Sequence, residues 1–185
     1  MNAPDPLLDE IIVLMEKVHT LYMQHYLDRE IFSFTWWVGI AMIVLPLLYW
    51  WKVVDRKRLL EMMLYGCFVN SISTFLDVGL SNFMMWEYPV QIFPHLALFM
   101  PVDYVLVPVI GMILYQKFPK WGPYILFSAI ASAAMSFLGE PFAVWLGMYK
   151  LIRWQYIYSF PIYTLVYIII KFLVERIVKI KTSQP

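Results

Sequence analysis

Five long stretches of the sequence carry almost no charge, and this feature restricts the possible folds more than any other. The stretches cover residues 31–51, 62–86, 88–116, 121–139 and 154–170. The second stretch contains one charged residue, Asp77, and the third contains only Asp103. A helix that crosses a bilayer needs about 20 predominantly apolar residues, whereas a soluble protein of this size has no need of five such stretches. We therefore expect an integral membrane protein.

The predicted fold is all-α: a polytopic transmembrane helix bundle of about five spans that follows an N-terminal amphipathic helix. The predicted spans are residues 31–51, 60–82, 92–116, 121–139 and 155–174. Within residues 1–30, apolar side chains recur at helical spacing and charged side chains occupy the other faces. Such a helix is expected to lie on the membrane or to cap the bundle. Residues 31–175 then form the bundle, and residues 176–185 form a basic cytoplasmic tail.

Positive charges in the short loops predict the orientation of the chain in the cell membrane. The basic residues form three clusters: Lys52, Arg56, Lys57 and Arg58; Lys117 and Lys120; Arg176, Lys179 and Lys181. With five spans all three clusters fall on one side, which should be the cytoplasm. The N-terminus is then outside and the C-terminus is cytoplasmic, with Lys150 and Arg153 as exceptions on the outer side. Lys171, near the cytoplasmic end of the last span, is expected to snorkel.

The sequence argues against several partners and cofactors. The formal net charge is only +1, and no nucleic-acid-binding motif is present. His95 and Asp103 lack the spacing of a metal-binding pair on a helix, and no cysteine or second histidine completes a site. We therefore expect no metal, no cofactor and no nucleic acid. The expected partners are membrane lipids, a small lipophilic ligand, and either a second copy of the chain or a membrane partner subunit.

Acidic residues inside the apolar runs are the strongest candidates for a functional site. A charged side chain at the bilayer centre costs roughly 2.5–3.5 kcal/mol on insertion scales, so it usually faces the protein interior. Asp103 lies near the middle of the third predicted span, and Asp77 lies in the second. Glu140 follows the fourth span directly at its outer end. A structural role, as neutral hydrogen-bonded acids between helices, is the alternative for both aspartates.

Helical spacing places each acid on a stripe of polar or small residues. The stripes are Asn70, Ser73 or Thr74, Asp77 and Ser81 on the second span; Gln91, His95 and Asp103 on the third; and Ser128, Ser132, Ser136 and Glu140 on the fourth. In antiparallel spans, all three stripes become more polar toward the outer face. The pattern predicts one polar pocket, open to the outside, that the three stripes surround. The serine stripe equally fits a closely packed helix interface.

The predicted pocket has an aromatic component. Seven tryptophans, Trp86 among them, are expected mainly in an aromatic belt at the membrane surfaces, whereas several tyrosines are candidates for the pocket. The complete set of predicted ligand-binding residues is Asp77, His95, Asp103, Tyr104, Ser136, Glu140, Tyr149, Trp154 and Tyr158. If the protein is an enzyme, the catalytic candidates are Asp103, Asp77 and Glu140.

Short motifs over most of the chain resemble an uncharacterised family of small five-span membrane proteins from spore-forming Firmicutes. The motifs are Asp55-Arg56-x-Arg58, Trp86-x-Tyr88, the Pro101/Pro108 span, Glu140-Pro141, Gly147-x-Tyr149, Trp154 and Tyr158-Ser159-x-x-Ile162-Tyr163. The resemblance implies a five-span architecture and no established biochemical activity. It implies no catalytic residue, but it draws attention to Glu140, Tyr149, Trp154 and Tyr158.

Three functions fit these observations. The leading hypothesis is a receptor, carrier or accessory subunit that binds a small or lipidic ligand in an outward-facing acidic and aromatic pocket. The second is a membrane-embedded enzyme that uses an intramembrane aspartate or glutamate as a general acid on a lipid or isoprenoid. The third is a structural scaffold for other membrane proteins.

Overall fold

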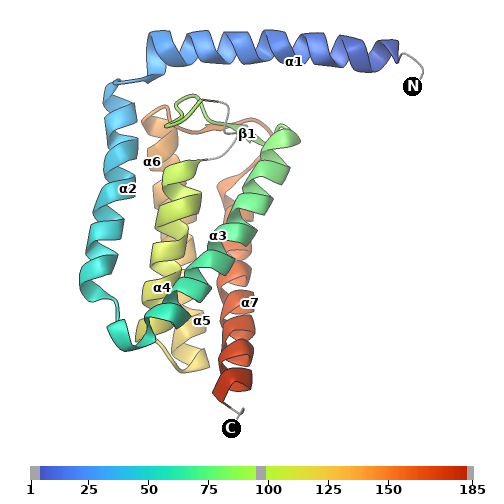
Figure 1. Ribbon diagram of the computed structural model, residues 1–185. Coiled ribbons are helices and arrows are strands. Elements are labelled where there is room, and N and C mark those ends of the chain that lie inside the picture. Colours follow the sequence, from blue (N-terminus) through green and yellow to red (C-terminus); the bar gives the residue numbers. More distant parts are fainter. Residues whose placement is uncertain (1–4, 95–98, 183–185) are drawn as a thin grey trace.

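The computed structural model describes residues 5–94 and 99–182, and within these residues the fold is a helix bundle with one helix laid across its end (Figure 1). Helix α1 comprises Pro6–His25, and the side chain of the preceding residue, Asp5, accepts hydrogen bonds from the backbone amides of Leu7 and Leu8. Asp5 therefore caps the helix. A π-helical turn, Tyr26–Glu30, follows α1 and leads the chain down into the bundle.

Four of the described helices are long and apolar enough to cross a membrane: Phe34–Val53, Arg56–Asn82, Trp121–Trp145 and Tyr156–Ile180. The first is α2, and the second comprises a short 3-10 turn, Arg56–Arg58, and α3, Leu59–Asn82. The third joins α5, Trp121–Ala134, through the π-helical turn Met135–Gly139 to α6, Glu140–Trp145. The fourth lies within α7, Tyr156–Thr182. The predicted all-α membrane bundle with an N-terminal amphipathic helix is confirmed, with four candidate spans among the described residues where the sequence predicts about five.

The remaining helix of the bundle is shorter and more enclosed than the others. It consists of a π-helical turn, Pro101–Leu106, and α4, Val107–Lys117. The sequence predicts a helix from residue 92, but residues 91–94 form turns instead. Pro89 and Pro94 bracket this segment, and a proline both lacks a backbone donor and disfavours helix in the residue before it. Helix α4 packs against α3, α5 and α2, and most of its side chains are buried.

Three buried tyrosines connect the helices at the centre of the bundle. The Tyr65 and Tyr124 hydroxyls are 2.6 Å apart, and Tyr124 also donates to the Tyr167 carbonyl at 2.9 Å. The Tyr167 hydroxyl donates to the carbonyl of Val107 at 3.0 Å. These bonds join α3, α5, α7 and α4 within an apolar core, so each hydroxyl is satisfied where water is excluded.

Lys171 of α7 is buried, with only 1% of its surface exposed, and does not snorkel to the surface as the sequence suggests. Its ammonium lies 2.9 Å from Glu175 Oε1 and 3.1 Å from the carbonyl oxygen of Pro119. The same ammonium lies 4.9 Å and 4.6 Å from the ring centroids of Tyr115 and Tyr124. Carboxylate, carbonyl and aromatic partners replace water around this charge.

Two short strands join the loops at the α1 end of the bundle. Strand β1, Trp86–Glu87, pairs antiparallel with β2, Lys150–Leu151. Between α3 and β1 the chain turns sharply, and Met84 there has a φ of 58°. This turn reverses the chain and brings the residues after α3 back over the end of the bundle.

Candidate functional site

Asp77 lies near the α1 end of α3 and is held by the loop that follows the helix. Trp86 Nε1 donates to Asp77 Oδ1 at 3.0 Å, and the Tyr88 hydroxyl donates to the same oxygen. The backbone amide of Phe99 lies 3.4 Å from Oδ2. The sharp turn after α3 brings Trp86 and Tyr88 back against α3. Their hydrogen bonds to Asp77 hold the loop that covers the cavity described below.

Asp103, in the π-helical turn Pro101–Leu106, faces Asp77. The two carboxyl groups line the cavity described below and interact electrostatically. Asp103 is buried, with 6% of its surface exposed, and its Oδ2 has no hydrogen-bond partner among the described residues. This pair therefore combines a satisfied acid on α3 with an acid that keeps an unused oxygen.

Glu140, the first residue of α6, supplies a second unused carboxyl oxygen. The Tyr163 hydroxyl of α7 lies 3.3 Å from Glu140 Oε1, whereas Oε2 is buried and has no hydrogen-bond partner within the described part of the chain. Glu140 directly follows the π-helical turn Met135–Gly139, and Asp103 lies within another such turn, Pro101–Leu106. Such turns are frequent at functional sites because the wider turn re-aims the neighbouring side chains.

All three acids line one cavity of about 260 Å³. Its polar wall contains Asp77, Asp103, Glu140, Ser159 and the tyrosine hydroxyl groups. The remaining wall is apolar and comes from α2, the Pro101–Leu106 turn, α4, α5–α6 and the loops: Met42, Val102, Leu106, Ile110, Met135, Phe142, Ala143, Leu146 and Met148, with the rings of Trp86 and Phe99. Among the described residues, the lining contains no Lys, Arg or His, so this part of the wall is acidic and apolar.

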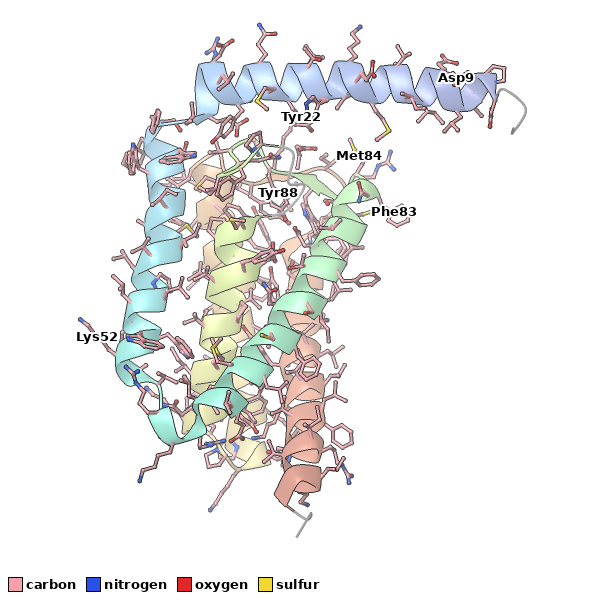
Figure 2. The ribbon with its side chains drawn as sticks, viewed as in Figure 1. Asp9, Tyr22, Lys52, Phe83, Met84 and Tyr88 are labelled. Atoms are coloured by element: carbon pink, nitrogen blue, oxygen red, sulfur yellow. The ribbon has the colours of Figure 1, made fainter. Side chains whose placement is uncertain are left out.

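Aromatic rings form the roof of the cavity under the strand pair. Tyr88 stacks on Phe99 and on Tyr149, with ring centroids 5.3 Å and 5.6 Å apart. Tyr88 and Tyr149 belong to the loops, and Figure 2 shows Tyr88 in the space beneath α1. Burial raises the pKa of both phenols above the ordinary value, and the carboxylate of Asp77 raises that of Tyr88 further. Both phenols therefore stay protonated at neutral pH and remain hydrogen-bond donors.

The structure brings four of the predicted site residues together and separates the others. Asp77, Asp103, Glu140 and Tyr149 line the cavity. Trp154 lines a smaller neighbouring cavity of about 50 Å³, which Asp77 and Asp103 also border.

The other predicted residues lie elsewhere. Ser136 is fully buried but does not line the cavity, in keeping with the packed-interface interpretation of its stripe. Tyr104 and Tyr158 point away from it, with 44% and 47% of their surfaces exposed. His95 lies outside the described residues.

Sequence reasoning missed the roles of Trp86 and Tyr163. Trp86 was expected in the aromatic belt but is buried against Asp77, with 6% of its surface exposed. Tyr163 of α7 reaches Glu140 from a helix on which we predicted only Tyr158 and, just before its start, Trp154. The position of Trp86 could have indicated its role. Trp86 lies four residues after the end of α3, and a chain that reverses there would bring the indole back to Asp77. No comparable signal points to Tyr163.

The arrangement offers hydrogen-bond acceptors inside an apolar, aromatic space. Among the described residues, no group of three or more His, Cys, Asp or Glu side chains is placed to hold a metal ion. In comparisons with protein-family models, curated proteins and solved structures, nothing matches the chain. The site's own geometry is therefore the basis for a functional proposal.

Proposed function

We propose that this membrane protein binds a lipophilic ligand in the acidic cavity, and that the ligand carries a hydroxyl or amino group. The proposal rests on one observation: two buried carboxyl oxygens in the wall of a largely apolar cavity, Asp103 Oδ2 and Glu140 Oε2, have no hydrogen-bond partner among the residues that the structure describes. A buried polar atom without a partner costs about 1–3 kcal/mol. A ligand that donates hydrogen bonds to these oxygens removes that cost.

The rim of the cavity supports entry from the bilayer. Met42 of α2, Leu106 and Phe142 of α6 line the cavity and are all at least partly exposed. Phe142 has 53% of its surface exposed. Exposed apolar side chains at this level of a membrane bundle face acyl chains, so a ligand dissolved in the bilayer reaches the cavity without crossing water.

The aromatic roof and the absence of basic residues in the lining favour a particular polar group. An amine gains an ion pair or charged hydrogen bond with the acids and contacts the faces of the aromatic rings. An alcohol gains the hydrogen bonds alone. A carboxylate is repelled by the acids, so we expect the order of affinity amine, alcohol, carboxylate.

The proposed orientation places the α1 end of the bundle outside the cell and the C-terminus in the cytoplasm. The basic cluster that includes Lys52 lies at the end of the bundle opposite α1, where the chain also ends (Figures 1 and 2). Positive charges gather on the cytoplasmic side of membrane proteins. The cavity, which lies under the loops at the α1 end, then occupies the outer half of the membrane. Membership of the five-span Firmicutes family is part of the same proposal.

Photolabelling in phosphatidylcholine liposomes tests the ligand proposal. Three probes share one long alkyl chain with a diazirine and end in an amine, an alcohol or a carboxylate. We expect saturable labelling of cavity-lining peptides by the amine and the alcohol, and little by the carboxylate. Asp103→Asn should weaken half-saturation by the amine about tenfold, equivalent to about 1.4 kcal/mol. Equal, unsaturable labelling by all three probes would overturn the proposal.

A matched control is available next to Asp103. Tyr104 belongs to the same helical turn but points away from the cavity. Tyr104→Phe should therefore leave the labelling by all three probes unchanged. Weaker labelling of Tyr104→Phe would show that the conformation of the turn, rather than the Asp103 carboxyl group, governs labelling.

A membrane enzyme is the second candidate function, and the two aspartates in the same cavity wall, Asp77 and Asp103, favour it. A protonated carboxyl group in an apolar cavity can deliver a proton to a bound lipid or isoprenoid, and the nearby rings can stabilise a developing cation. Lipid extracts from cells with the protein, without it and with Asp103→Asn distinguish the two functions. A lipid species that depends on both the protein and Asp103 supports the enzyme, whereas an unchanged lipid profile supports binding alone.

A further inference from the structure

One face of α1 is apolar and points toward the bundle end of the molecule. The Tyr22 hydroxyl donates to Glu87 Oε1 in the loop at 3.0 Å, and Figure 2 shows Tyr22 on the underside of the helix. Residues that precede Tyr22 by whole helical turns share its face. These residues are Leu8, Ile11, Met15 and Val18. All four are exposed, from 44% for Ile11 to 66% for Met15.

The opposite face of α1 is mainly polar. Its residues are Asp9, Glu10, Val13, Glu16, Lys17, Thr20 and Gln24. Three acidic residues and one lysine give this face an acidic excess. The helix is therefore amphipathic, and its polar face does not have the basic character of helices that bind anionic lipid.

The position of α1 supplies the second observation. Figure 1 shows α1 lying crosswise to α2, α4 and α7 at their ends, and its N-terminal half extends beyond α3. The long apolar helices define the direction of the membrane normal. The underside of the projecting half then faces the bilayer surface beside the bundle, where it continues the lipid-facing surface of the spans.

We propose that α1 lies in the membrane interface and inserts the face formed by Leu8, Ile11 and Met15 among the lipids of the nearest leaflet. This insertion involves no residue of the acidic cavity and is independent of the proposed ligand. Because the outward face is acidic, insertion rests on burial of apolar surface and does not need anionic headgroups. Phosphatidylcholine alone is a sufficient partner.

Spin labelling of the complete protein in phosphatidylcholine vesicles tests this proposal. The background variant is Cys67→Ala, which removes the single cysteine of the chain. Labels are placed at Ile11→Cys and Met15→Cys on the underside. Val13→Cys is the matched control, because Val13 is also apolar, has 63% of its surface exposed and lies on the opposite face.

The proposal predicts opposite collision profiles on the two faces of α1. At Ile11 and Met15, collisions with oxygen should exceed those with a water-soluble nickel complex severalfold, and at Val13 this ratio should reverse. Equal ratios at all three positions would overturn the proposal. So would dipolar broadening at Met15 that disappears on dilution with unlabelled protein, because a second copy would then occupy the face. Insertion that requires added phosphatidylglycerol would overturn the claim that phosphatidylcholine suffices.

Discussion

At the scale of single residues, the two buried aspartates differ in how their oxygens are used. Asp77 accepts hydrogen bonds from Trp86, Tyr88 and the Phe99 amide, whereas Asp103 keeps Oδ2 without a partner. Asp77 is therefore needed to hold the loop over the cavity. Asp103 is the acid that is available to a ligand.

This difference predicts unequal effects on stability. Asp77→Ala leaves the Trp86 and Tyr88 donors without their acceptor, so we expect a loss of about 2–4 kcal/mol in the free energy of unfolding. Asp103→Asn keeps the shape and leaves the loop intact, so its loss should stay below about 1 kcal/mol. Reversible unfolding in bicelles measures both values. Equal losses in the two variants would contradict the division of roles.

Lys171 predicts a second effect on stability. Lys171→Met removes a buried cation from Glu175 and the Pro119 carbonyl. We expect a loss of about 3 kcal/mol, at the lower end for a broken buried pair, because Glu175 is partly exposed. The control is Lys57→Met at an exposed position, where the change should stay within about 0.5 kcal/mol. A loss for Lys171→Met no larger than for Lys57→Met would show that the buried contacts of the Lys171 ammonium do not stabilise the fold.

Helical spacing predicted that Asp77, Asp103 and Glu140 lie close together. Residues spaced by whole turns share one face of a helix, and the polar faces of neighbouring helices turn toward the interior of the bundle. The spacing did not predict the partners of these acids. Trp86 reaches Asp77 through a reversed turn, and Tyr163 reaches Glu140 from another helix. Such contacts depend on loop conformation and on helix rotation, which apolar periodicity does not determine.

At the scale of the elements, each of two π-helical turns is followed by a proline that removes one backbone hydrogen-bond donor. In a π turn, a carbonyl accepts from the amide five residues later. For Asp103 and Ser136 that position is occupied by Pro108 and Pro141, which have no amide hydrogen. Asn70 Nδ2 of α3 lies 3.4 Å from the Asp103 carbonyl and takes the place of the missing donor. The prolines thus leave carbonyls that neighbouring helices can satisfy.

A double-mutant cycle tests this exchange between Asn70 and the missing amide. Asn70→Leu should cost about 1–2 kcal/mol, because it leaves the Asp103 carbonyl without its side-chain donor. Pro108→Ala supplies an amide at the same place, so the cost of Asn70→Leu should fall in that background. Additive losses in unfolding free energy would refute the compensation.

The sequence did not predict the π-helical turn of this helix. A π turn inserts an extra residue per turn, and its stability depends on packing against α2 and α3 rather than on the local sequence. The predicted first residue of the third span was also wrong. Residues 92–94 are apolar like a span, but Pro89 and Pro94 disfavour a helix there. Apolarity reports the environment of a segment and does not by itself report its conformation.

At the scale of the whole molecule, α1 and the acidic cavity lie at one end of the bundle and the basic cluster at the other. In the Cys67→Ala background, Asp28→Cys at the α1 end should react with a membrane-impermeant maleimide on intact cells. Lys57→Cys at the basic end should react only after permeabilisation. The reverse pattern would invert the proposed orientation and place the cavity in the cytoplasmic leaflet.

The most direct test of the ligand cavity is to fill it with a side chain. Ala143 lines the cavity and has 7% of its surface exposed, whereas Ala134 is exposed and does not line it. Saturable photolabelling by the amine probe is measured in Ala143→Phe and in Ala134→Phe. We expect Ala143→Phe to abolish it and Ala134→Phe to retain it. Wild-type labelling in Ala143→Phe would contradict the account.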